Sequence, residues 1–297
     1  MRSFASGILL LLLLLPLSRQ VQAHNISGSL KPGIDLIDVP VADSSLRFLS
    51  QAPLRLMLSQ GLGSVKLDLA YMICPTAGDP AFEGSSGGIS PFRISDLDER
   101  ILPSEWNGTE SFSLLQNLDR LSVCLRLPFS NLTLGRQAIY WGVSKSISPT
   151  DFIAPFQYGT IDTEYRVGVD AIRSTFPIGM MSELDAGWVF GKDAHFNRSG
   201  GWLRGRFYML QTDAVLLAAC FRENLMLGGS LNRAIGGATG WLELAVVSTA
   251  VFAENPPDYD KETFWSASAG MDRSWFNASL YGYLEYHFNS PGAIDPE

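Results

Sequence analysis

The sequence predicts an all-β protein, a transmembrane antiparallel up-and-down β-barrel of about 12–14 strands. Apolar and polar residues alternate with a period of two through most of the chain, and many alternating runs are longer than a typical strand. The chain is also 46% hydrophobic and only 18% charged. Successive side chains of a strand face opposite sides, so each run has one apolar and one polar face. Runs of this length suit strands that cross a bilayer at a tilt.

The N-terminal residues 1–23 have the pattern of a secretory signal peptide, and residues 24–297 are expected to form a single β-barrel domain. Arg2 supplies the positive charge, Ile8–Leu15 the apolar core, and Val21-Gln22-Ala23 the small-residue cleavage site. The apolar core is too short to cross a bilayer as a helix, which takes about 20 residues. The sequence therefore predicts export.

The remaining chain divides into thirteen expected strands. They are 26–37, 53–61, 64–73, 118–128, 130–142, 167–177, 182–191, 201–211, 213–222, 224–232, 239–252, 263–274 and 276–289. Tight turns and longer links alternate, as in a barrel with turns at one rim and loops at the other. The turn at Arg222-Glu223-Asn224 is too short for its place in this alternation. Single-chain bacterial barrels have even strand numbers, so either the C-terminal closing strand is missing or a weaker strand assignment is wrong.

The most distinctive motifs lie between residues 131 and 173. They are Gly135-Arg136-Gln137, Trp141-Gly142, Ser148-Pro149, Asp151, Pro155-Phe156 and the run from Gly168 to Arg173, with Tyr283–Asn289 as a further match near the C-terminus. In these motifs the chain resembles Gram-negative outer-membrane barrels of the porin type, most closely poorly characterised barrels with a GRQ-x-x-x-WG strand and an SP-x-D-x-x-x-PF loop. The resemblance covers residues 115–190 well and 260–290 moderately. It implies an outer-membrane location and, more loosely, a pore or transport role.

The chain departs from that family at two places. It ends Gly292-Ala293-Ile294-Asp295-Pro296-Glu297 where the family has an aromatic closing strand, and Arg166-Val167-Gly168 replaces the expected proline-glycine. The first departure agrees with the odd number of strands. It puts closure of the barrel by this chain alone in doubt, because an open sheet edge in lipid leaves backbone groups unsatisfied.

Alternation also predicts which side chains line a lumen. The expected lining residues are Lys66, Asp68, Arg126, Arg136, Arg173, Arg204, Arg206, Arg222, Glu243, Asp272 and Glu285. A loop folded against the wall would narrow the lumen and set its ion preference. The expected charged residues of this constriction are Asp151, Asp162, Glu164 and Asp170. The same charges could instead pair with one another and pin the loop to the wall, and the sequence leaves both interpretations open.

The sequence predicts no catalytic site, cofactor or metal centre. Residues 84–88 match G-x-S-x-G, but they lie in a Gly/Ser-rich loop without the strand and helix of a nucleophile elbow. The three histidines, His24, His195 and His287, lack ligand spacing. The three cysteines, Cys74, Cys124 and Cys220, are far apart and allow at most one internal bridge.

The leading functional hypothesis is a porin-like outer-membrane channel for passive passage of small solutes. Its expected partners are outer-membrane lipid, the solutes and the barrel-assembly machinery, and homo-oligomerisation is left open. A net charge of -8 without a Lys/Arg run argues against nucleic-acid binding. A non-conducting structural or assembly-partner barrel is the alternative, and a secreted ligand-binding β-sandwich is the third hypothesis.

Overall fold

A computed structural model describes residues 25–38, 46–79, 90–97, 99–103, 109–155, 165–253, 262–277 and 279–290. The strands are β1 (Asn25–Leu30), β2 (Gly33–Asp38), β3 (Leu46–Gln51), β4 (Leu54–Leu62), β5 (Val65–Gly78), β6 (Arg100–Leu102), β7 (Phe112–Arg126), β8 (Asn131–Gln137), β9 (Val169–Ile178), β10 (Ser182–Val189), β11 (Gly200–Met209), β12 (Thr212–Phe221), β13 (Asn224–Ile235), β14 (Ala238–Ser248), β15 (Thr263–Trp275) and β16 (Leu280–Asn289). Two 3₁₀ turns, η2 (Lys192–Ala194) and η3 (Phe196–Arg198), join β10 to β11. No helix among the described residues has the length and apolar character needed to span a membrane. The expected signal peptide lies outside the described residues.

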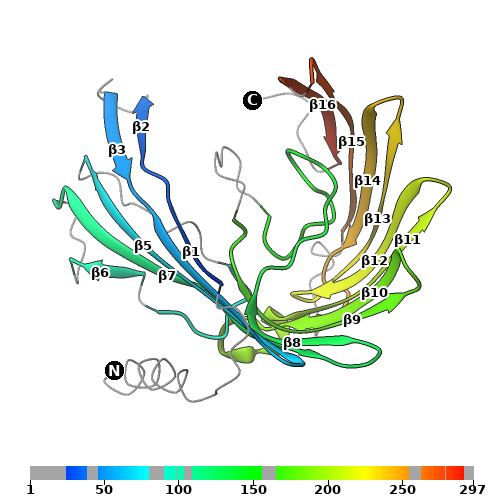
Figure 1. The fold of residues 1–297 in the computed structure, drawn as a ribbon, viewed down its shortest axis with the longest axis horizontal. Coiled ribbons are helices and arrows are strands. Elements are labelled where there is room, and N and C mark those ends of the chain that lie inside the picture. The colour runs from blue at the N-terminus through cyan, green and yellow to red at the C-terminus, as the bar shows by residue number, and fades with distance from the viewer. Residues whose placement is uncertain are drawn as a thin grey trace.

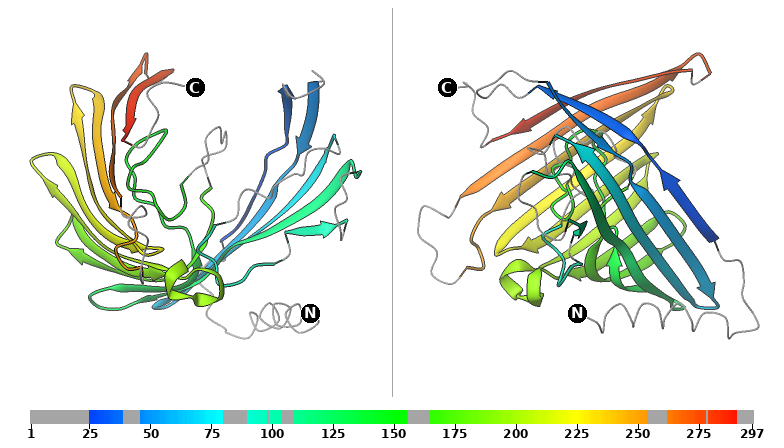
Figure 2. Two further views of the ribbon diagram at one scale, coloured as in Figure 1. Left: turned by 180° about the vertical axis from the view of Figure 1, so that it is seen from behind. Right: turned by 90° about the vertical axis from the view of Figure 1, so that its left-hand side faces the viewer.

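One antiparallel sheet contains all of these strands, and it curves into an open U (Figure 1; Figure 2). Its main path runs β1-β4-β5-β7-β8-β9-β10-β11-β12-β13-β14-β15-β16, which is thirteen strands in chain order. The predicted all-β, antiparallel architecture is therefore confirmed, and the path has the expected thirteen strands, whereas β2, β3 and β6 lie off it. Within the described part of the chain, β1 and β16 form two edges that do not pair with each other.

The first predicted strand is interrupted rather than continuous. Residues 26–37 divide at Lys31-Pro32 into β1, which pairs with β4, and β2, which pairs with β3. Proline has no N–H to donate to a ladder, so the regular pairing stops there. The prediction missed β3, which continues the line of β4 beyond the two-residue break at Ala52-Pro53.

Two further differences concern the rim opposite the tight turns. β8 ends at Gln137, whereas the corresponding expected strand 130–142 extended to residue 142, because the chain turns after Gln137 into the concave side of the sheet (Figure 1). The short Arg222-Glu223 link is a genuine two-residue hairpin turn, with both residues at positive φ (46° and 71°). Such left-handed pairs match the twist of antiparallel strands, so this rim carries one tight turn among its longer loops.

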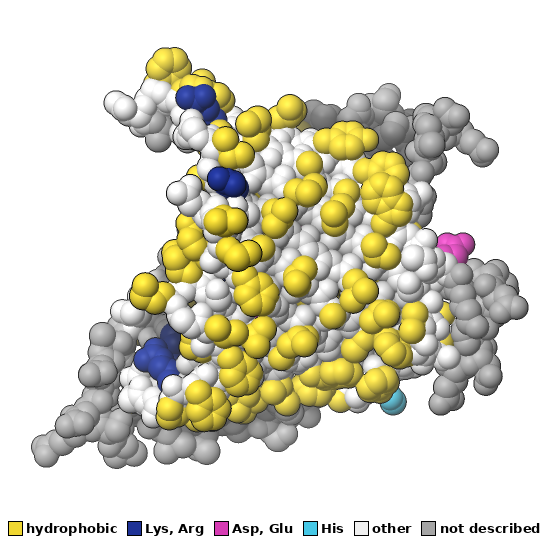
Figure 3. Space-filling model, turned by 90° about the vertical axis from the view of Figure 1, so that its right-hand side faces the viewer, with side chains coloured by type: hydrophobic (Ala, Val, Ile, Leu, Met, Phe, Trp, Pro, Cys, Tyr) yellow, Lys and Arg dark blue, Asp and Glu magenta, His cyan; other side chains and the backbone are white. Residues whose placement is uncertain are grey.

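The two faces of the sheet differ in character. The outer face presents large apolar side chains to the surroundings, and exposure reaches 67% at Leu216 and 77% at Leu284 (Figure 3). The inner face carries charged side chains, of which Asp185 and Glu243 are fully buried. This distribution is the reverse of that in a water-soluble sandwich, where the apolar faces meet inside.

Candidate channel lining and inward-folded loop

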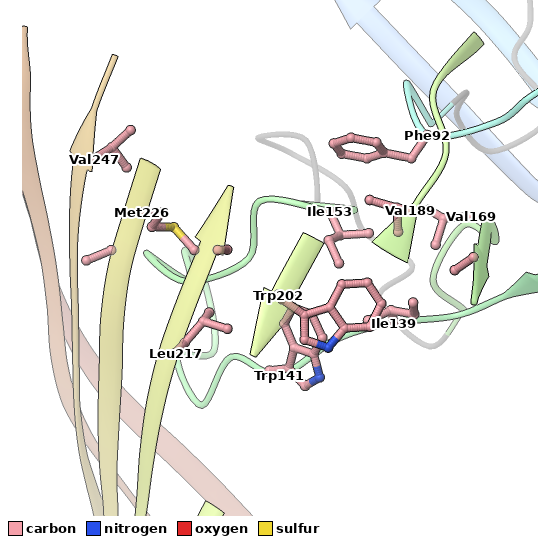
Figure 4. Packing of buried hydrophobic residues seen from close by; sticks show 13 residues of the cluster. Phe92, Ile139, Trp141, Ile153, Val169, Val189, Trp202, Leu217, Met226 and Val247 are labelled. Carbon is pink, nitrogen blue, oxygen red and sulfur yellow. The ribbon is translucent and has the colours of Figure 1, made fainter. Parts of the chain in front are cut away.

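Residues 138–155, here named the inner loop, fold into the concave side of the sheet (Figure 1). The loop leaves β8 and packs Ile139, Trp141 and Ile153 against inward-facing residues of the wall (Figure 4). The ring centroids of Trp141 and Trp202 lie 5.2 Å apart. The whole cluster is Phe92, Ile139, Trp141, Ile153, Val169, Ala171, Val189, Trp202, Leu217, Ala219, Met226, Ala245 and Val247. Burial of these apolar groups holds the loop against β9 to β14.

Glu243 on β14 attaches the inner loop by six hydrogen bonds. Its Oε2 accepts from the backbone N–H groups of Val143 (3.1 Å) and Ser144 (3.0 Å) and from the Ser144 hydroxyl (2.8 Å). Its Oε1 accepts from the hydroxyls of Ser148 (2.5 Å) and Thr150 (2.5 Å) and from the Thr150 N–H (3.0 Å). A buried carboxylate is costly without partners, and here the loop supplies all of the hydrogen bonds that the structure shows for it.

Glu285 on β16 holds the neighbouring part of the same loop. Its carboxylate accepts the N–H groups of Lys145 (2.7 Å), Ser146 (3.1 Å) and Ile147 (3.3 Å), and also the indole N–H of Trp241 (3.0 Å). The Ser268 hydroxyl on β15 donates to the Ile147 carbonyl (2.8 Å). The inner loop therefore connects β14, β15 and β16 through polar contacts.

Asp185 on β10 lies beneath the aromatic part of the inner loop. It accepts the indole N–H groups of Trp141 and Trp202, each at 3.1 Å, and Arg173 Nη2 lies 2.6 Å from its Oδ2. Asp185 is fully buried while Arg173 keeps 23% of its side chain exposed. The predicted lining residue Arg173 thus faces inward and is neutralised by an acid that the prediction did not include.

Arg136 on β8 and Asp170 on β9 lie opposite each other in the register of the two strands and form an ion pair. The Arg136 Nε and Nη2 atoms lie 2.8 Å and 3.0 Å from the two Asp170 oxygens. Residues 90–97 close over this pair: Asp96 accepts from Arg136 (2.8 Å), and the Ile94 N–H donates to Asp170 (2.9 Å). Arg136 is therefore part of a buried network rather than a free cation on the wall.

The chain following the inner loop reaches the opposite wall. Arg166 forms an ion pair with Asp151 (2.7 Å), and its guanidinium lies 4.0 Å from the centroid of the Tyr140 ring. The neighbouring Tyr165 ring lies under Lys31 Nζ at 4.8 Å and the Arg55 guanidinium at 4.3 Å. The inward-folded chain consequently contacts both arms of the U.

Two titratable groups of the inner loop are perturbed by burial. Burial raises the pKa of Asp151 to about 6, although the adjacent Arg166 acts in the opposite direction. Burial likewise raises the pKa of the Tyr140 hydroxyl to about 12, again opposed by Arg166. Of the other predicted constriction residues, Asp170 is placed as above, whereas Asp162 and Glu164 lie outside the described residues.

Most of the remaining predicted lining residues are paired on the inner face. The pairs are Lys66–Asp68 (2.9 Å), Arg204–Glu183 (3.0 Å), Arg206–Asp213 (3.1 Å) and Asp272–Lys145 (3.5 Å). Arg126 lies exposed at the end of β7. Arg222 lies in the β12–β13 turn rather than on a strand, with its guanidinium 5.8 Å from the centre of the Phe92 ring.

The prediction missed several residues that complete these networks. Glu183 and Asp185 belong to the same inward-facing alternation on β10, so periodicity could have found them. Asp119 pairs with Arg55 at a place where the β5–β7 register shifts by one residue. Because a bulge reverses the alternation locally, simple periodicity could not place Asp119.

The described part of the chain contains no group of three or more His, Cys, Asp or Glu residues that could hold a metal ion. His287 contacts Ser268, with Nδ1 and Oγ 2.7 Å apart, beneath the inner loop. All three cysteines are free. The G-x-S-x-G segment lies outside the described residues. What the geometry offers is a charged concave surface, narrowed by an attached loop, inside an apolar outer wall.

These features together define a curved β-sheet wall with a charged inner face and an apolar outer face. No family model matches the chain, and no curated protein matches it. Solved structures similar to it include Pseudomonas aeruginosa OpdK with vanillate (10% identity, 91% of this chain and 68% of that one, TM-score 0.44). They also include P. aeruginosa OccK8 (OprE; 9%, 91% and 71%, 0.47) and a BenF-like porin from Pseudomonas fluorescens Pf-5 (13%, 90% and 67%, 0.46). The chain spans about two thirds of the length of such structures.

Proposed function

We propose that this protein is a porin-like channel of a Gram-negative outer membrane that allows passive passage of small solutes. The observation that carries the proposal is the inner loop, which Glu243 and Glu285 attach to the charged inner face of a sheet with an apolar exterior. A loop held inside a polar, membrane-embedded wall narrows the lumen and determines which solutes fit. The signal-peptide pattern at residues 1–23 supports export to such a membrane.

The distribution of apolar side chains favours this proposal over a soluble sandwich. Leu203, Leu216 and Leu227 expose more than half of their side chains on neighbouring strands, and water would be a poor environment for such a continuous apolar surface. In a membrane, lipid acyl chains would cover that apolar surface, and the inward-facing ion pairs would contact water in the lumen.

A closed pore requires the gap between β1 and β16 to be filled. Along an antiparallel path of thirteen strands the first and last run in the same direction. An odd number of further strands, alternating in direction, would therefore close the wall with regular pairing and give the even number found in single-chain bacterial barrels.

The proposal is tested by refolding the full chain into detergent and recording single channels in planar bilayers. We expect discrete conductance steps, together with faster gel migration before heating than after it. A soluble product whose migration is unchanged by heating would refute a membrane barrel. A heat-modifiable protein with no conductance at any salt concentration or voltage would refute the channel and favour a structural barrel.

A further inference from the structure

Two arginines interrupt the apolar outer face close to one rim. Glu243 points to the concave side, so the register of β13 to β15 places Arg233 and Arg273 on the outside, where both are exposed. At the outward positions of β10 to β16, whose residues are all described, these are the only charged side chains. Figure 3 shows this face as predominantly hydrophobic, with its few basic side chains along the left-hand margin.

The arginines flank a shallow floor of small residues. Arg233 pairs with Gly240 and Arg273 pairs with Ala238, both on the intervening strand β14. Neighbouring strands lie about 4.8 Å apart, so the backbones of β13 and β15 are separated by about 10 Å. Two long arginine side chains can therefore both reach a group held above β14.

Apolar side chains lie between this floor and the tight turns. Ile235 is two residues beyond Arg233, and its Cδ1 lies 3.8 Å from the position that a Cβ on Gly240 would occupy. Trp275 is two residues beyond Arg273, and its ring covers Gly282 on β16. Tryptophan beside basic residues is typical of the membrane–water interface, which places the arginine pair at the level of the lipid headgroups.

Among the described residues, the guanidiniums of Arg233 and Arg273 have no ion-pair partner, in contrast to two arginines of the inner face. Arg173 and Arg204 form ion pairs with Asp185 and Glu183. By contrast, the described residues provide neither an ion pair nor a hydrogen bond for the Arg233 and Arg273 side chains. Arginine on the lipid side of a barrel is costly in hydrocarbon and tolerated near the interface, where an anion can satisfy its planar donors.

We propose that Arg233 and Arg273 bind the phosphate of an anionic phospholipid at the tight-turn rim. The guanidiniums would hold the phosphate over Gly240 and Ala238, while the acyl chains would lie along the apolar surface at Leu242 and Met271. This inference rests on the proposed function, because it requires the outer face to contact a membrane. The interior ion pairs take no part in it.

The test measures binding of phosphatidylglycerol to the refolded full chain by native mass spectrometry, with phosphatidylcholine as the zwitterionic comparison. Each basic side chain near an anionic surface contributes about fivefold to binding. We expect R233Q and R273Q each to weaken the first bound phosphatidylglycerol about fivefold and the double variant about 25-fold. The matched control R198Q removes an exposed arginine from the opposite rim and should leave binding unchanged. R233K/R273K, which keeps both charges but loses the fork geometry, should bind with intermediate affinity.

Equal phosphatidylglycerol binding by the parent and the double variant would overturn the proposal. Equal binding of phosphatidylcholine, or binding of inorganic phosphate to the parent without measurable binding of phosphatidylglycerol, would also overturn it. Conductance measured on the same preparations separates the two hypotheses. A variant series that conducts normally without a lipid preference refutes only the lipid site, whereas a chain that neither inserts nor conducts refutes the proposed function.

Discussion

Replacing Glu243 by glutamine should release the inner loop from the wall. The substitution keeps the size of the side chain, but it exchanges one carboxylate oxygen for an NH₂ group that cannot accept hydrogen bonds. Whichever way the amide is oriented, one set of three loop contacts loses its acceptor. If the amide nitrogen takes the place of Oε2, the N–H groups of Val143 and Ser144 both lose their acceptor. The reverse orientation is less costly, because the hydroxyls of Ser148 and Thr150 can turn to accept from the amide nitrogen and only the Thr150 N–H loses its acceptor.

The size of the effect follows from those contacts. A buried donor left without a partner costs about 1–3 kcal/mol, so the less costly orientation, with one unpaired N–H group, loses about 2 kcal/mol. A loss of about 2 kcal/mol corresponds to roughly a thirtyfold change in the equilibrium between attached and detached loop, since 1.4 kcal/mol is about tenfold. The apolar contacts of Trp141 and Ile153 remain and oppose complete release.

Two measurements report the state of the loop. In planar bilayers we expect E243Q to show larger or noisier single-channel currents than the parent. In micelles, trypsin should cleave faster after Lys145, which directly follows the Glu243-bound residue Ser144 and is itself bound by Glu285. The matched control is E183Q, because Glu183 pairs with Arg204 on the inner wall and has no hydrogen bond to the inner loop. Unchanged currents and an unchanged cleavage rate in E243Q would refute the assigned role of this carboxylate.

Three further predictions concern the same interior. E285Q weakens the acceptor for three loop N–H groups and for the Trp241 indole. Its effect on single-channel currents should resemble that of E243Q but be smaller, because the Glu285 contacts are more exposed. A larger effect than that of E243Q would show that Glu285, and not Glu243, is the main attachment of the loop. D185A leaves Arg173 and two indole N–H groups without their acceptor. It should therefore destabilise the folded barrel by about 3–5 kcal/mol, which lowers the urea concentration at the midpoint of unfolding. An unchanged midpoint would contradict the stabilising role of the Arg173–Asp185 pair. Because burial raises the pKa of Asp151 to about 6 from its ordinary value of 3.8, the folded loop binds this proton more readily than the unfolded chain. The contribution of Asp151 to stability is then fully present below about pH 4 and is lost as the pH rises through about 6. Loop-dependent current noise should accordingly fall between pH 7 and pH 5 in the parent, and a D151N channel with the same pH dependence would argue against this assignment.

Much of the wall could be predicted because alternation is a local property. Residues such as Leu203 and Arg204 alternate between the two faces of one strand, so their sides follow from sequence alone. The same reasoning placed Glu243, Asp272 and Glu285 on the inner face, where the structure finds them in contact with the inner loop. It failed at Pro32 and Asp119, where a missing N–H and a bulge interrupt regular pairing.

The contacts of the inner loop could not be predicted from alternation. Its motifs identified it as distinctive, but they left open whether its charges face a solute or pair with the wall. The structure pairs Asp151 with Arg166 and Asp170 with Arg136, which is the second of the two interpretations for these residues. The attachment itself is made largely by backbone N–H groups and serine or threonine hydroxyls, which carry no charge pattern to recognise.

Alternation is enough to assign the all-β class and the inward or outward side of most strand residues, because it depends only on neighbouring residues of one strand. The contact between Glu243 and Ser144, 99 residues earlier in the chain, and the separate edges at β1 and β16 of the described sheet are visible only in the folded structure. They depend on the curvature of the sheet, which brings distant strands around one interior. Which buried acceptor meets which donor there depends on that curvature and on the path of the loop, and neither is encoded in local alternation.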